Sequence, residues 1–226
     1  MSGTNTDLAA RAVVFSDTMD WTESPAGGVW RKRLYQDGPA ESGRVTSLVR
    51  FDAGSKFPHH DHPEGEEILV LSGTFSDDTG DWGAGSYLLN PEGSPHAPHT
   101  DDGCELFVHL KQYRGPAKRR VDTRAETWQP GARDGIESIL LHEEEDGPDG
   151  PLSIRLVRIA PGCEVPDHAH PLGEEALLIE GDVVDDQGSY GPGCWVRNPV
   201  NSHHWARSDG GALLYVRNGG LGLAVG

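Results

Sequence analysis

The segment H-D-H-P-E-G-E-E-I-L-V-L-S-G (residues 60–73) follows the pattern H-x-H-x3-E-x6-G, which returns at residues 168–181 as H-A-H-P-L-G-E-E-A-L-L-I-E-G. Each copy is followed by G-x5-P-x4-H, which ends at His96 in the first half and at His204 in the second. Every matched residue lies 108 positions before its partner. Two copies in register predict two similar domains. Three histidines and a glutamate are a set that binds a divalent metal.

The remaining sequence is typical of an all-β protein. Glycine (30 residues) and proline (16) are spread throughout and separate short apolar runs of strand length. No long segment shows a helical apolar period, so helix should be scarce, with a turn near residues 7–11. We predict strands at 45–51, 67–71, 86–89 and 105–110, and again at 153–159, 176–180, 194–197 and 212–217. Many short strands with frequent turns indicate barrels or sandwiches.

The repeat also predicts where the chain divides. Upstream matches such as Trp21 with Trp128 are offset by 107, so one residue of slip falls in the acidic stretch at 142–151. We expect one domain at residues 10–117 and a second at 118–226. The basic cluster Lys118, Arg119 and Arg120 lies at this junction and is expected to be a solvated linker.

Strand alternation explains why this spacing can form a metal site. Residues two apart on a strand point to one face, so His60 and His62 both point inward, as does Glu66 if the strand resumes after residues 63–65. Glu67 and Glu175 should point outward, and the repeat favours His204 over the neighbouring His203. The predicted ligands are His60, His62, Glu66 and His96 in the first half and His168, His170, Glu174 and His204 in the second.

The ligand chemistry suits one divalent ion per domain, with iron, zinc, manganese and nickel among the candidates. Ligands from one barrel wall leave one or two positions open to water or substrate, which favours a reactive metal over a purely structural one. The sequence assigns no catalytic residue. We expect a small-molecule substrate or effector as the partner, and a homodimer is a further expectation.

Composition excludes other classes of partner. The formal charge of −17 argues against nucleic acid and anionic membrane surfaces, which need clustered Lys and Arg. Three cysteines without a CxxC pattern argue against a disulfide framework. The first residues show no signal peptide, and no stretch has the length of an apolar membrane span. We therefore expect a cytoplasmic protein.

The two motifs resemble those of the cupin superfamily. Its first motif, G-x5-H-x-H-x3,4-E-x6-G, is met in both halves, beginning at Gly54 and Gly162. Its second motif, G-x5-P-x-G-x2-H-x3-N, is met by Gly85, Pro91, Gly93 and His96 with Thr100 at the last position, and by Gly193, Pro199 and His204 with Asn201 and Ser208 as replacements. The resemblance implies two tandem double-stranded β-helix (jelly-roll, cupin) barrels, and thus a bicupin.

Within the cupins, H-P-E-G-E-E-I-L-V-L-S-G-T-F-S-D-D (residues 62–78) is similar to the ChrR-type group. That group includes the C-terminal domain of ChrR anti-sigma factors and resembles acetylacetone-cleaving dioxygenases. The resemblance implies a divalent-metal-binding bicupin that acts as a metal-dependent oxygenase on a small carbonyl-containing compound. The alternative is a ChrR-like sensory or regulatory metal-binding cupin that lacks the anti-sigma domain.

Overall fold

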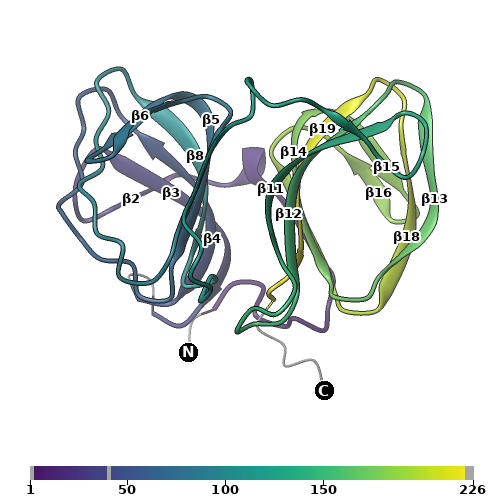
Figure 1. Ribbon diagram of the computed structural model, residues 1–226, viewed down its shortest axis with the longest axis horizontal. Helices are drawn as coiled ribbons and strands as arrows, with labels where there is room; N and C mark the ends of the chain where they lie inside the picture. Colours follow the sequence, from purple (N-terminus) through teal and green to yellow (C-terminus); the bar gives the residue numbers. More distant parts are fainter. Residues whose placement is uncertain (1–2, 40–41, 222–226) are drawn as a thin grey trace. The chain divides into compact units, whose positions relative to one another are not determined.

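A computed structural model describes residues 3–39 and 42–221. Within these residues the regular secondary structure is β-strand apart from one short 3-10 helix at Ser16–Thr18. Ala10 N donates to Asp7 O in the expected turn. No helix in the described ranges is long and apolar enough to cross a membrane. The chain divides into two compact units, each an antiparallel barrel (Figure 1), which confirms the all-β fold with two tandem jelly-roll barrels.

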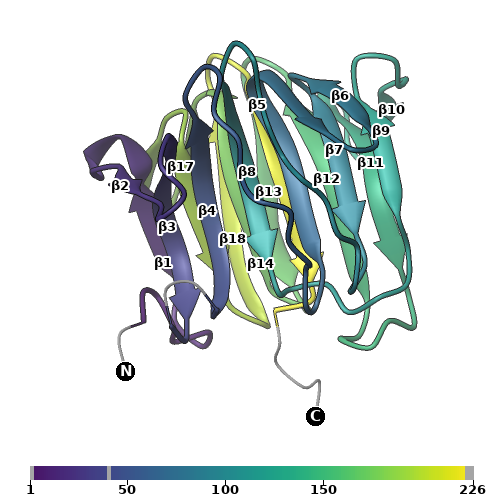
Figure 2. The same cartoon turned by 90° about the vertical axis from the view of Figure 1, so that its left-hand side faces the viewer.

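The first unit contains residues 3–6 and Met19–Ala125. Its main sheet has the order β2-β3-β4-β8-β5-β7-β9, and β6 pairs with the C-terminal part of β5. Figure 2 shows β3, β4, β8 and β5 side by side. Isolated bridges such as His60 with His96 also join segments of this unit. The strands are β2 (Thr22–Glu23), β3 (Val29–Asp37), β4 (Arg44–Phe51), β5 (Glu66–Asp77), β6 (Gly80–Gly83), β7 (Ser86–Asn90), β8 (Cys104–Leu110) and β9 (Arg119–Asp122).

The second unit contains Asp7–Thr18 and residues 126–221. One sheet has the order β1-β17-β14-β19-β12-β11-β10 and the other has the order β13-β18-β15-β16. The strands are β1 (Ala12–Phe15), β10 (Gln129–Pro130), β11 (Ile136–Glu144), β12 (Leu152–Ile159), β13 (Cys163–His170), β14 (Glu174–Gly181), β15 (Val183–Asp185), β16 (Gly188–Tyr190), β17 (Cys194–Asn198), β18 (Ser202–Ser208) and β19 (Ala212–Gly219). All eight strands predicted from the sequence are present across the two units.

Strand alternation selects the side chains that face the interior of the second barrel. Glu174, Ala176 and Leu178 of β14 line an internal cavity, as do alternate residues of β17. The intervening Glu175 and Leu177 are buried but do not line it. The alternation of side chains along β14 therefore makes Glu174 face the same cavity as Ala176 and Leu178.

The first strand of each sequence repeat belongs to the unit built by the other repeat. β1 pairs with β17 in the second unit, and β9 pairs with β7 in the first unit. These two strands are related by the 107-residue offset seen at Trp21 and Trp128. The boundary between residues 117 and 118 stays a prediction. The expectation of a solvated linker is wrong for Arg120, because this residue lies in β9 and is half-buried.

A close backbone approach fixes the end of β14. Gly181 has φ +83°, and a methyl group added there would collide with the carbonyl oxygen of Gly211. Gly162 has a similar φ of +74° but has nothing within 4 Å of the added methyl. A comparison of substitutions at the two glycines therefore separates the free-energy cost of a left-handed backbone from the cost of a steric clash.

We predict that Gly162→Ala lowers the free energy of unfolding by about 1 kcal/mol, the cost of a left-handed residue with a side chain. Gly181→Ala should cost about 3 kcal/mol or more, because overpacking adds to the same strain. Urea unfolding followed by circular dichroism measures both. Equal losses in the two variants would contradict the close approach.

Candidate metal centres

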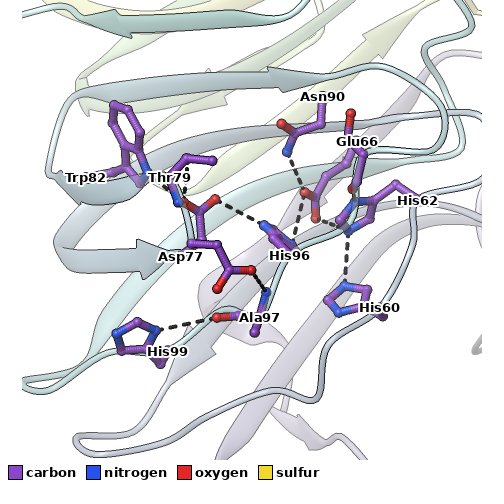
Figure 3. A network of polar contacts seen from close by, with 12 residues as sticks. His60, His62, Glu66, Asp77, Thr79, Trp82, Asn90, His96, Ala97 and His99 are labelled. Carbon is purple, nitrogen blue, oxygen red and sulfur yellow. Dashed lines mark hydrogen bonds and ion pairs between the residues drawn. The ribbon is translucent and has the colours of Figure 1, made fainter.

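Three imidazoles meet in the first unit, as Figure 3 shows. His60 and His96 are paired through a backbone bridge, and His62 lies two residues further along the chain. The ring centroids are 4.6–5.1 Å apart, and one ring nitrogen from each of the three residues lies within 4.8 Å of the others. Glu66, the first residue of β5, places Oε1 3.4 Å from His62 Nε2 and Oε2 3.6 Å from His96 Nε2.

Hydrogen bonds hold the outer nitrogen of each of these rings. His60 Nδ1 donates to Pro58 O at 2.8 Å, and His62 Nδ1 donates to Ser94 O at 2.8 Å. His96 Nδ1 lies 3.2 Å from Asp77 Oδ2. Because a carbonyl oxygen only accepts, the proton lies on Nδ1 of His60 and His62, which leaves the Nε2 lone pair available to a metal.

The second unit repeats this arrangement on β13 and β18. His168 pairs with His204 across the two strands, and the rings of His168, His170 and His204 have centroids 4.8–5.0 Å apart. His168 Nδ1 donates to Pro166 O at 3.1 Å. Glu174 Oε2 lies 3.4 Å from His170 Nδ1, so the ring of His170 presents a different nitrogen to its glutamate than His62 does.

Both donor sets fit a divalent metal. The Nε2 atoms of His96 and His170 are buried and have no hydrogen-bond partner among the described residues, a condition that is costly without a ligand. Burial lowers the pKa of His60 and His204 and lowers that of His170 to about 4, so these rings are neutral and able to coordinate. Burial also raises the pKa of Glu174, and a bound cation would favour its anionic form.

The structure brings all eight predicted residues together in two groups of three histidines and one glutamate. Their role as metal ligands stays a prediction. His203 is exposed and contacts Asp167 at 3.1 Å, away from the cluster that contains His204. Glu67 lies outside the cluster of three histidines, but Glu67 and Glu175 are buried rather than solvated, and Glu67 lies 3.8 Å from the imidazole of His109.

The departure from the cupin motif at Asn201 does not alter the local backbone. Gly93 has φ +74°, and its amide donates to His62 O at 3.2 Å. Asn201 has φ +62°, and its amide donates to His170 O at 2.8 Å. Asparagine tolerates the left-handed conformation better than most residues with a side chain. The turn that precedes His204 therefore keeps the form it has before His96.

Sequence reasoning missed an outer layer around the first cluster. Asn90 Nδ2 donates to Glu66 Oε2 at 3.0 Å, and Arg120 Nη2 donates to Asn90 Oδ1 at 2.7 Å. Burial disfavours ionisation of Asp77, but hydrogen bonds from His96, Thr79 and Trp82 outweigh it and hold the pKa of Asp77 well below its usual value. Asp77 therefore stays anionic and fixes the ring of His96.

The second cluster has the equivalent outer layer. Asn198 Nδ2 donates to Glu174 Oε1 at 3.1 Å, and Arg11 Nε donates to Asn198 Oδ1 at 2.9 Å. Arg11 also forms an ion pair with Asp185, whose other oxygen accepts from Tyr190 at 2.8 Å. The aspartates and asparagines repeat at the 108-residue offset and could have been found in the sequence. The two arginines are 109 residues apart and therefore do not repeat at that offset.

The space beside the two clusters differs. In the second unit a cavity of about 310 Å³ reaches His168, Glu174 and His204 and has mostly apolar walls. In the first unit the cavity beside His60 and His96 has a volume of only about 70 Å³. A small organic molecule therefore has more room beside the second cluster than beside the first.

Comparisons with known proteins agree with this architecture. A family model described as the ChrR cupin-like domain matches residues 9–114 and again residues 116–222. No curated protein matches the sequence.

Three solved structures share the fold at low sequence identity. A proposed dioxygenase from Nostoc punctiforme has 16% identity and a TM-score of 0.77, over 96% of this chain and 85% of that chain. YlbA from E. coli has 15% identity and a TM-score of 0.73, over 98% and 96%. Oxalate decarboxylase from Lactobacillus farciminis, in complex with formate, has 14% identity and a TM-score of 0.65, over 93% and 86%. At these identities the likeness shows the fold alone.

Metal content should respond to the two clusters separately. Wild-type protein should bind close to two divalent ions per chain, one at each cluster. His62→Ala should reduce this to about one, because the ligands of each site come from one unit. The control is His59→Ala, which removes an exposed histidine three residues earlier and should leave the content unchanged. Elemental analysis after gel filtration measures the ratio. An unchanged content in His62→Ala would refute the first site.

The outer layer of the first cluster should also affect the affinity for metal. Asp77→Asn should weaken metal binding in the first unit by about 10- to 100-fold, because it removes the anion that orients His96. The neighbouring Asp78→Asn is the matched control, since Asp78 accepts only the backbone amide of Ala97 in this region. Competition with a chromophoric chelator gives both affinities. Equal weakening by the two changes would show that general charge, and not orientation, controls the site.

Proposed function

The chain belongs to the ChrR cupin-like family, and we propose that it is a metal-dependent oxygenase that acts on a small carbonyl-containing compound. The observation that carries the proposal is the position of the second histidine cluster on the wall of a cavity of about 310 Å³. A metal held there would be within reach of a small molecule. Ligands that come from one side leave coordination positions for it.

The residues of the second cluster and its outer layer would have different roles. The neutral imidazoles of His168, His170 and His204, with the carboxylate of Glu174, would hold the ion, and Asp185 would orient His204 at 3.4 Å. A divalent metal supplies Lewis-acid polarisation of a carbonyl oxygen and, as iron(II), the capacity to activate O2. The apolar walls would exclude bulk water from the reacting carbonyl and strengthen electrostatic interactions within the cavity.

Two proteins of the same fold have names that support the proposal. The similar structures include a proposed dioxygenase and an oxalate decarboxylase with bound formate. The first name refers to a reaction with O2, and the second refers to small oxygenated molecules. The net charge of −17 is in keeping with a small-molecule partner and not with nucleic acid.

The alternative is a regulatory module that binds a small effector or reacts with an oxidant at the same metal. The family match favours this reading as well, because its description refers to ChrR. The two functions differ in turnover. An oxygenase consumes O2 in proportion to substrate, whereas a sensor holds its metal and effector without consuming either.

Metal identity and O2 uptake test the proposal. Protein purified without added metal should contain iron, and iron(II)-loaded protein should consume O2 when pentane-2,4-dione is added. His168→Ala should abolish this uptake by removing a ligand beside the cavity, while His59→Ala should not affect it. An oxygen electrode with elemental analysis gives both results. Tightly held zinc without O2 uptake for any small diketone would favour the regulatory alternative.

A further inference from the structure

We infer that the two barrels have different tasks: the second barrel binds a small, carbonyl-bearing aliphatic ligand, whereas the first barrel fills the corresponding space with its own side chains. The inference deepens the proposed function and rests on it for the metal beside the ligand. It assigns both the barrel that receives the organic molecule and the chemical class of that molecule.

Four substitutions between the repeats, three of them at phenylalanines, account for the difference in volume. Phe51, Phe57 and Phe75 line the small cavity of the first unit. At the 108-residue offset the second unit has Ile159, Val165 and Val183, which line the large cavity. Each change replaces an aromatic ring with a smaller aliphatic side chain. Ala176 likewise stands where the first unit has Ile68.

The walls of the larger cavity favour a ligand with an aliphatic chain. Most of the lining side chains are apolar, and the polar ones other than Arg133 gather at the histidine cluster and the outer layer behind it. Among the lining residues, Ala132 and Arg133 are exposed, so the cavity reaches the surface of the unit at this loop. An aliphatic chain would gain by leaving water for this space, and a polar group at its end would face the cluster.

One donor in this cavity indicates an oxygen acceptor on the ligand. Arg11 lines the cavity, its side chain is only 13% exposed, and its Nη1 is buried without a hydrogen-bond partner among the described residues. The positive charge of Arg11 is already balanced by its ion pair with Asp185. A carbonyl oxygen at the end of the ligand could accept a hydrogen bond from Nη1.

The arginine that lines the smaller cavity is Arg31, whose guanidinium lies 5.9 Å from the centroid of the Phe57 ring. Arg120 bonds Asn90 as Arg11 bonds Asn198, but Arg120 does not line the smaller cavity. Trp82, at the position of Tyr190, packs against the phenylalanine-rich core of the first unit. The two cavities therefore differ in shape and in the arginine that lines each of them.

The test measures occupancy without turnover. Zinc-loaded protein is titrated with unbranched 2-alkanones in an isothermal calorimeter. We expect one ketone per chain, with affinity that rises roughly fourfold per added methylene from propanone to hexan-2-one, as burial of each CH₂ predicts.

Variants locate the site. Val183→Phe and Val165→Phe place in the second cavity the side chains that the first unit has at the same positions, so the fold and the zinc content should be retained. Each should lower the affinity for hexan-2-one at least tenfold. Phe75→Val is the control and should leave the wild-type site within twofold. Wild-type affinity in both phenylalanine variants, or two equal ketone sites in wild-type protein, would overturn the inference.

The outcomes separate this inference from the proposed function. Ketone binding that is lost in Val183→Phe, in a protein that never consumes O2, would support the second-barrel site and reject the oxygenase. O2 uptake with pentane-2,4-dione that Val183→Phe and Val165→Phe leave unchanged would support the oxygenase and reject the second-barrel site.

Discussion

The interaction on which each unit depends is the convergence of three imidazoles and one carboxylate on a single point inside a barrel. The ring centroids lie 4.6–5.1 Å apart in the first unit, and the inward nitrogen of His96 has no hydrogen-bond partner in the described ranges. Without a cation, burying such nitrogens beside Glu66 costs free energy, on the order of 1–3 kcal/mol for each unsatisfied group. With a cation, the same arrangement becomes favourable, because neutral imidazoles and an anionic carboxylate are its natural ligands.

The surrounding residues hold the three histidines and the glutamate of each cluster in position. Asp77 and Asp185 orient one histidine in each unit, and Asn90 and Asn198 hold the glutamates. The arginine that holds each asparagine comes from the segment that begins the other repeat. The exchange of β1 and β9 therefore contributes to each candidate metal centre a residue that its own repeat does not encode. The same exchange brings Arg11 to the second cavity, where its free donor becomes available to a ligand.

Much of this architecture could be predicted from the sequence, because the period of two along a strand is a local property and the 108-residue repeat shows the same local pattern twice. The spacing H-x-H-x3-E indicated which side chains share a face, and all eight predicted residues meet in two clusters. The role of Arg120 could not be predicted, since β-strand pairing between distant segments leaves no mark at a fixed spacing. The burial of Glu67 and Glu175 was missed for a similar reason, because alternation gives the face of a sheet but not what covers it. The volumes of the two cavities could not be predicted either, because a cavity volume depends on how all the surrounding side chains pack. The replacement of phenylalanine by valine or isoleucine is nevertheless visible in the sequence once the two repeats are aligned.

The most direct test of the account is the position of bound metal, measured by anomalous diffraction from a crystal of the zinc-loaded protein. The account predicts two strong peaks per chain, each about 2.0–2.1 Å from the imidazole nitrogens of one cluster and within coordination distance of Glu66 or Glu174. A well-loaded crystal with peaks elsewhere, or with no peak among His168, His170 and His204, would contradict it.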